Sequence, residues 1–174
     1  MAVLIIEDLV SRKWITTVVS AEETSTQVAL GFTQALEAEG LLDEAVERGA
    51  HRLIDPYSDD DAHRPVLLAV SDNGAQMTST STRAFRPCTR SSSNFGRPGT
   101  PQDQGWIESF NGHLKIENPH LLAIEDPVVL RAELAVIRPH YNEVRLHEGI
   151  GYVTPNDEHE GTGDAIRKAR DAQE

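Results

Sequence analysis

A run of five consecutive apolar residues, Val66 to Val70, constrains the fold of this chain more than any other feature. A strand that is apolar at every position, rather than at alternate positions, is typical of a sheet covered on both faces. The run ends just before Asp72, and open α/β sheets build their sites at the carboxyl ends of their strands. The sequence therefore predicts an α/β fold with a functional carboxylate at a strand end.

The first 40 residues predict a hairpin followed by a helix. Residues 2–6 are continuously apolar and residues 13–19 are rich in β-branched side chains, a pattern typical of a hairpin. The S-x-x-E sequence that begins at Ser20 has the form of a capping box, and apolar residues then recur at helical spacing until Gly40. We therefore expect a helix over residues 21–39.

A second helix is predicted after Thr100-Pro101, which reads as an N-cap followed by proline at the first helical position. At about 100° per residue, Glu108, Asn111 and Lys115 fall on one face of this helix. The opposite stripe is apolar and contains Trp106, Ile107, Phe110 and Leu114. Glu108 and Lys115 are two turns apart on one line, so they could meet the same substrate.

A third helix is predicted to begin at Asp126-Pro127. Its expected buried face is formed by Leu130, Leu134, Ile137 and Tyr141. Pro139 removes a backbone donor, so we expect it to kink or interrupt the helix. We assign residues 1–156 to one domain and residues 157–174 to a charged tail, either a surface helix or disordered.

Composition bounds the function. The net charge of −12 disfavours an isolated DNA-binding module, because lysine and arginine contacts to phosphate supply most of the affinity for nucleic acid. Residues 66–120 are the exception, with 5 basic and 4 acidic residues. Cys88 is the only cysteine, which excludes an internal disulfide or a thiolate zinc site. No apolar run suits a membrane span and no signal peptide is evident, so we expect a cytoplasmic protein.

Asp72 and Glu108, with 35 residues between them, suit a site for phosphoryl transfer. Carboxylates are the hard oxygen ligands that hold Mg²⁺ or Mn²⁺, and two such ions about 3.5 to 4 Å apart stabilise the attacking and leaving oxygens of an in-line displacement. Lys115 would add a positive charge for phosphate. Taken singly, Asp72 reads as the start of a turn and Glu108 as an ordinary exposed helix residue. Their occurrence together favours function.

Four segments of the chain, in order, resemble the catalytic core of insertion-sequence DDE transposases and retroviral-type integrases. They read D-L-V-S-R-K, S-D-N-G-A-Q-M-T-S, F-G-R-P-G-T-P-Q-D-Q-G-W-I-E-S-F-N-G-H-L-K and P-H-Y-N-E-V-R-L-H-E-G-I-G-Y-V-T-P. The resemblance implies an RNase H-like mixed sheet flanked by helices, in which Asp72 is the second and Glu108 the third metal-binding carboxylate. It also implies Mg²⁺ or Mn²⁺ as cofactor, transposon-end DNA and a second copy of the chain as possible partners, and no membrane.

The same resemblance assigns residues to DNA binding. Lys115 matches the basic residue that follows the glutamate on the same helix and contacts the DNA end. We add Asn111, Arg97 and Arg145 to this set. Arg145 belongs to the Y-N-x-x-R-x-H signature of residues 141–147, for which a structural or DNA-positioning role is expected rather than catalysis.

Two parts of the chain depart from the family pattern. The family's first aspartate lies on an opening strand, whereas Met1 begins within the partner of that strand, so two carboxylates would hold ions that normally use three. We therefore expect a sheet without its first strand and a truncated, inactive copy. Residues 86–94 contain no large aliphatic side chain where the family has an apolar strand, which favours an altered reading frame or an exposed loop about equally.

Three functions compete. The first is a Mg²⁺-dependent transposase catalytic domain that acts through Asp72 and Glu108, with the first aspartate supplied upstream. The second, favoured for the chain as given, is a non-catalytic interaction protein that associates with full-length transposase. The third is a phospho-acceptor domain in which Glu7 and Asp8 form an acidic pocket and Asp72 takes the phosphate, although no suitably placed lysine completes such a site.

Overall fold

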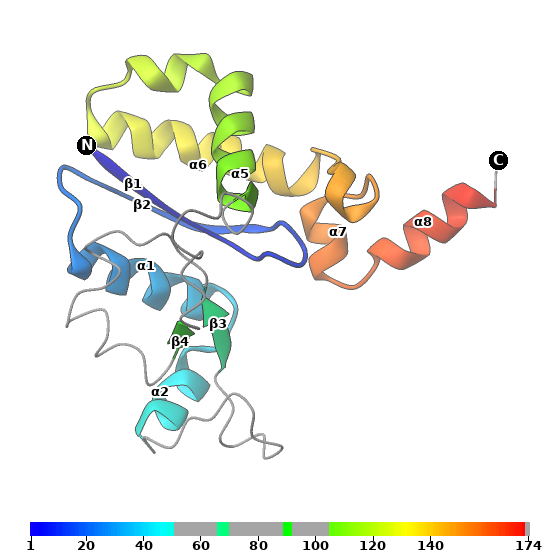
Figure 1. The fold of residues 1–174 in the computed structure, drawn as a ribbon, viewed down its shortest axis with the longest axis horizontal. Helices are drawn as coiled ribbons and strands as arrows, with labels where there is room; N and C mark the ends of the chain where they lie inside the picture. The colour runs from blue at the N-terminus through cyan, green and yellow to red at the C-terminus, as the bar shows by residue number, and fades with distance from the viewer. Residues whose placement is uncertain (51–65, 70–88, 92–104, 173–174) are drawn as a thin grey trace.

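The computed structural model describes residues 1–50, 66–69, 89–91 and 105–172. Its elements in chain order are β1 (Ala2–Glu7), β2 (Trp14–Ser20), α1 (Ser25–Ala38), α2 (Leu42–Ala50), β3 (Leu67–Ala69), β4 (Thr89–Ser91), α5 (Gly105–Glu117), η3 (Pro119–Ala123), α6 (Pro127–Glu143), η4 (Glu148–Ile150), α7 (Pro155–His159) and α8 (Gly163–Asp171). In Figure 1 the β1–β2 hairpin crosses the centre of the molecule, with α1 on one side and α5 and α6 on the other. Among the described helices, none has the length and apolar character needed to cross a membrane. The cytoplasmic location stays a prediction.

The described strands form two two-stranded sheets, antiparallel β1–β2 and parallel β3–β4. The predicted hairpin is confirmed, and β3 lies within the apolar run that predicted a strand. β4 lies in the polar stretch of residues 86–94, so the exposed-loop interpretation is wrong for Thr89–Ser91. Pairing with β3 supplies backbone partners there, and strand formation depends on such context more than on side-chain type. The α/β class is confirmed, whereas an RNase H-like mixed sheet without its first strand stays a prediction.

The register of the hairpin shifts at the end of β1. Ile6 pairs with Thr16, but the next residue, Glu7, pairs with Trp14. An extra residue in one strand changes which way the side chains beyond it face. Trp14 consequently packs in the same cluster as Val19, against α5 and α6 and on the side of the hairpin away from α1.

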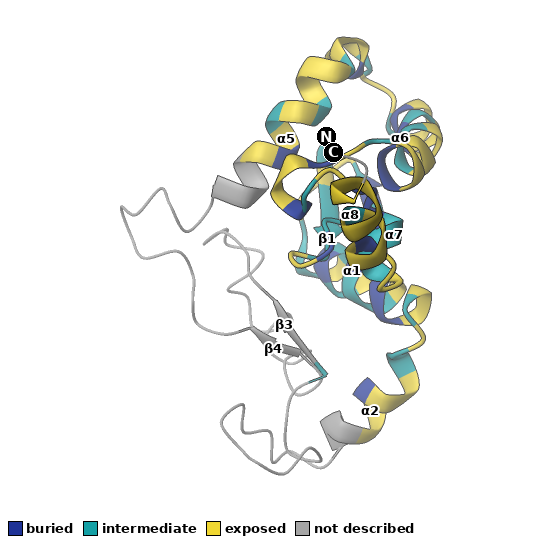
Figure 2. Ribbon diagram, turned by 90° about the vertical axis from the view of Figure 1, so that its right-hand side faces the viewer, coloured by how far each residue is buried: buried dark blue, intermediate teal, exposed yellow. Residues whose placement is uncertain are grey.

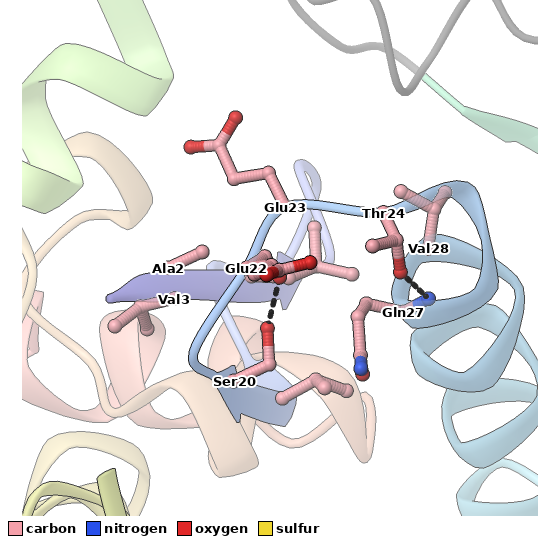
Figure 3. A pocket seen from close by; sticks show the side chains of 10 residues that line it. Ala2, Val3, Ser20, Glu22, Glu23, Thr24, Gln27 and Val28 are labelled. Atoms are coloured by element: carbon pink, nitrogen blue, oxygen red, sulfur yellow. Dashed lines mark hydrogen bonds between the residues drawn. The ribbon is translucent and has the colours of Figure 1, made fainter.

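α1 begins at Ser25, four residues later than the sequence predicted. The side chain of Thr24 accepts a hydrogen bond from the Gln27 N–H, so Thr24 rather than Ser20 is the N-cap (Figure 3). The Ser20 hydroxyl donates instead to a carbonyl two residues further along the chain. The predicted end is confirmed, because the chain leaves the helix at Gly40 with a φ of 69°, a left-handed conformation that glycine adopts without strain.

α6 begins at Pro127 with Asp126 as its N-cap, as predicted. The expected inward face is confirmed, with Leu130, Leu134 and Tyr141 buried and Ile137 packed against the same cluster. The helix continues through Pro139 to Glu143, so the expected interruption at the proline is wrong, and the expected kink stays a prediction. Arg138 and Asn142, on either side of Pro139, both bind the backbone of β2, and these contacts stabilise the helix across the proline.

Three side chains of α6 bind the backbone of β2. The Asn142 side chain accepts a hydrogen bond from the Trp14 N–H and donates one to the Trp14 carbonyl, both at 2.9 Å. Arg131 and Arg138 each donate to a further β2 carbonyl at 2.9 Å. These side chains satisfy backbone groups on the edge of β2 that does not face β1, as a neighbouring strand would do elsewhere.

The C-terminal region is helical and lies at the surface. α8 is mostly exposed (Figure 2), which agrees with the surface-helix alternative for residues 157–174. In α7, Nε2 of His159 lies 2.7 Å from the Glu39 carboxylate and Nδ1 lies 3.1 Å from the Ser11 hydroxyl. α7 therefore contacts both the hairpin connection and the end of α1, and the division at residue 156 stays a prediction.

Replacing Asn142 with alanine should destabilise the protein by about 2–4 kcal/mol, because two buried backbone groups of Trp14 lose their partners. Urea unfolding measured by circular dichroism gives this difference. Asn111→Ala, at an exposed helix position, is the matched control and should change the free energy of unfolding by less than about 0.5 kcal/mol. Equal effects of the two substitutions would contradict the anchoring role of Asn142.

Candidate functional site

α5 carries three of the predicted site residues: Glu108, Asn111 and Lys115. Asn111 and Lys115 are exposed, and the helix period puts Glu108 in line with them. The other side of α5 is fixed by Phe110, which is 7% exposed and meets the Trp14 ring edge-on with centroids 5.3 Å apart. The helix therefore turns its predicted functional face away from the core.

Three of the predicted site residues are not fully described by the structure. Asp72, Arg97 and the side chain of Glu108 lie outside the described residues. Asp72 comes three positions after Ala69, the carboxyl end of β3, so the strand expected before it is present. In the part of the chain that the structure describes, no three histidine, cysteine, aspartate or glutamate side chains are grouped to hold a metal ion. The convergence of Asp72 and Glu108 stays a prediction.

A cluster of aromatic rings joins α5 to α6 and β2. Tyr141 lies edge-on to Trp14 and Phe110, with ring centroids 5.8 and 5.1 Å apart, and to His147 at 4.6 Å. Trp14 is 0% exposed and anchors the core at the start of β2. Edge-to-face packing of this kind stabilises a core beyond simple burial. The position of α5 thus depends on residues of the Y-N-x-x-R-x-H signature.

Arg145, a residue of this signature, contacts the C-terminal end of α5. Its Nε and Nη2 donate to the Glu117 carboxylate at 2.8 to 3.1 Å, and its Nη1 lies 3.0 Å from Nδ1 of His147. The hydrogen bonds from Arg145 lower the pKa of Glu117. Burial, reinforced by the nearby Arg145 charge, lowers the pKa of His147 to about 4, so this ring is neutral at pH 7.

Glu7 and Asp8 are neighbours in the sequence but bind different partners. Burial raises the pKa of Glu7 to about 7, and its carboxylate lies 3.5 Å from the Tyr141 hydroxyl. Burial also raises the pKa of Asp8, but hydrogen bonds led by the one from the Ser11 hydroxyl outweigh it and leave that pKa lowered. The nearby charge of Asp8 also adds to the raised pKa of Glu7, and the phospho-acceptor alternative stays a prediction.

Sequence reasoning missed two features of this region, the Arg145–Glu117 pair and the raised pKa of Glu7. The first joins residues 28 positions apart, and the second depends on burial beneath Tyr141. Neither follows from local spacing. A pocket between the start of β1 and the start of α1 has a volume of about 60 Å³ (Figure 3), which suits a few water molecules rather than a cofactor.

Part of the chain is similar to known proteins. Residues 89–155 match the family model of the integrase core domain. The chain is 30% identical over 95 residues to the transposase for insertion sequence element IS904 from Lactococcus lactis subsp. lactis (strain IL1403). The alignment covers 54% of this chain and 38% of that protein, so the chain spans well under half the length of this relative. No solved structure matches.

Glu7→Gln should stabilise the protein at pH 8 but not at pH 4. Because the folded-state pKa of Glu7 is raised from 4.5 to about 7, ionising this carboxyl costs folding free energy progressively between those pH values. Removing the charge should therefore raise the free energy of unfolding at pH 8 by about 3 kcal/mol relative to the change at pH 4. Urea unfolding at both pH values tests this, with exposed Glu125→Gln as the control. A gain independent of pH would contradict the assignment.

Proposed function

We propose that this chain acts in DNA transposition through metal-dependent phosphoryl transfer, because residues 89–155 match the integrase core domain and the chain is similar to an insertion-sequence transposase. The observation that carries the proposal is α5. This helix lies within the matched segment and exposes Asn111 and Lys115 on the face to which the helix period assigns Glu108. A carboxylate, an amide and an ammonium group in line suit a metal-bound phosphodiester.

Asp72 and Glu108 are the residues we propose to hold Mg²⁺ or Mn²⁺. The donor set fits, because both ions prefer carboxylate oxygens, and a strand end and a helix are rigid supports for such ligands. When bound, the ion supplies positive charge for the attacking and leaving oxygens. Phe110 contributes indirectly, since its packing against Trp14 keeps α5 from moving with the substrate.

Lys115, Asn111 and Arg97 are the residues we propose to contact transposon-end DNA. Lys115 would bind a phosphate as a point charge, two helical turns from Glu108. Asn111 lies between them on α5 and can donate to a phosphate oxygen through its amide. Residues 66–120 have a net charge of +1, compared with −8 for residues 1–65, so DNA would approach this part of the chain most readily.

A non-catalytic interaction protein that associates with full-length transposase is the second candidate. The observation that favours it is the net charge of −12, which opposes independent binding to a polyanion. A transposase partner would then supply the DNA contacts. Metal binding separates the two candidates, because only the catalytic one requires Asp72 and Glu108 to act together.

Titration of the chain with Mn²⁺ in a calorimeter is the test of the catalytic proposal. We expect binding that the double variant Asp72→Asn, Glu108→Gln abolishes, because both carboxylate ligands are lost. The double variant Glu125→Gln, Glu160→Gln removes the same charge from exposed positions and should bind as the unaltered chain does. Undetectable binding by the unaltered chain, or binding that survives in the first variant, would favour the non-catalytic candidate.

A second copy of the chain is the partner we propose for the outer face of α6. Val128, Val129 and Val136 are 69%, 48% and 73% exposed, although the inner face of the same helix is also apolar. A helix with apolar residues on both sides is typical of one that is buried on both sides. A two-fold interface uses the same patch on each copy, and an uncharged stripe along one helix can pack against itself.

Val136→Glu should weaken self-association at least tenfold, because it would bury a charge in the proposed interface. Sedimentation equilibrium over a concentration series measures the dimer dissociation constant. Val144→Glu, also at an exposed position but just beyond the end of α6, is the control and should leave that constant unchanged. A chain that sediments as a monomer at every concentration would exclude this partner.

A further inference from the structure

Arg145 binds the C-terminal end of α5 through two of its three guanidinium nitrogens. Nε contacts both oxygens of the Glu117 carboxylate at 3.0 and 3.1 Å, and Nη2 contacts one of them at 2.8 Å. Glu117 is the last residue of α5. A bidentate contact between a guanidinium and a carboxylate fixes the relative orientation of the two groups as well as the distance between them.

The guanidinium is itself held by the residues around it. Its carbon lies 5.7 Å from the centre of the Tyr141 ring, and Nη1 lies 3.0 and 3.2 Å from the two ring nitrogens of His147. Tyr141 and His147 are both buried, and their rings meet edge-on. Arg145 is therefore held against a rigid surface, and through it so is the end of α5.

Among the described residues, α5 is attached at Phe110, at Leu114, which packs against the same core cluster, and at Glu117. Phe110 is packed between Trp14 and Tyr141, and Glu117 is held by Arg145 seven residues later, about 10 Å along the helix axis. The two apolar contacts lie one helical turn apart, and the contact at Glu117 extends the attached length to the end of the helix. Glu108 and Lys115 each lie two residues from one of these attachments.

The Arg145–Glu117 ion pair is expected to orient α5 more than to stabilise the fold. The side chains of Arg145 and Glu117 are 20% and 45% exposed, and ion pairs open to solvent contribute little to the free energy of folding. A displacement of about 1 Å at a catalytic group can nonetheless lower activity a hundredfold. The contact is thus better suited to setting the position of α5 than to holding the fold together.

We propose that Arg145 is a positioning residue: through Glu117 it sets the direction of α5 and so the placement of Glu108 and Lys115 relative to Asp72. This inference rests on the proposed function of that face of α5. It replaces the expected DNA contact of Arg145, because each of the three guanidinium nitrogens contacts Glu117 or His147.

The test measures helix direction and metal affinity together. Residual dipolar couplings of backbone N–H groups report the orientation of α5 relative to α6 in solution, independently of function. Arg145→Gln and Glu117→Gln should each alter the α5 couplings while leaving those of α6 unchanged. They should also raise the Mn²⁺ dissociation constant about tenfold, the usual effect of losing a group that supports a metal ligand.

Two further variants distinguish loss of the Arg145–Glu117 pair from misfolding. The exchange Glu117→Arg, Arg145→Glu preserves the pair with its charges reversed and should restore both the couplings and the affinity towards those of the unaltered chain. Lys168→Gln removes an exposed positive charge on α8 and should change neither. A loss that came only from misfolding would not be recovered by the exchange.

The outcomes separate this inference from the proposed function. Altered α5 couplings that the exchange restores support the positioning role even where the unaltered chain binds no Mn²⁺, a result that would count against the proposed function alone. Unchanged α5 couplings in Arg145→Gln overturn it. A DNA contact by Arg145 would then be the better explanation if the salt slope of DNA binding, the change of log affinity with log salt concentration, fell by about 1 in this variant, as expected for a lost phosphate contact.

Discussion

The structure depends on the pair of hydrogen bonds that the Asn142 side chain makes with the backbone of Trp14. Trp14 begins β2, and its N–H and carbonyl would otherwise be buried without partners at a cost of about 1–3 kcal/mol each. Only an amide side chain offers a donor and an acceptor in the required arrangement. This single contact joins α6 to the hairpin at the position from which the aromatic cluster is built, and α5 is packed on that cluster.

The register shift in the hairpin decides which layer receives Trp14. In a regular strand, Trp14 would face the same way as Thr16 and Val18, towards α1. The shift after Ile6 reverses this, and the indole ring instead meets Phe110 and Tyr141. One extra residue in β2 therefore determines that α5 packs on the side of the hairpin occupied by α6.

Features with a local cause could be predicted from the sequence. The hairpin, β3, the end of α1 at Gly40 and the N-cap of α6 each follow from a few adjacent residues. The start of α1 was placed too early because Ser20 and Thr24 both begin capping sequences, and only the folded chain shows which side chain binds the helix. β4 was missed because its partner, rather than its own residues, makes it a strand.

The same distinction applies to the candidate site. The exposure of Asn111 and Lys115 follows from helical spacing, so the sequence was sufficient to predict it. The partners of Arg145 and Asn142 are 28 and 128 positions away, and no spacing rule connects them. The signature of residues 141–147 suggested a structural or positioning role, but the geometry was needed to identify Trp14 and Glu117 as what those residues hold.

α6 illustrates how tertiary contacts override local preference. Proline within a helix removes one hydrogen bond and clashes with the preceding turn, at a cost of about 3 kcal/mol, and the valines of this segment also have low helix propensity. Against this, Arg138 binds β2 just before Pro139 and Asn142 binds it just after. On the helix these two side chains lie one turn apart on the same face and so reach adjacent residues of one strand. The helix is thus determined by β2 as much as by its own sequence, and this is why local reasoning expected it to be kinked or interrupted at the proline.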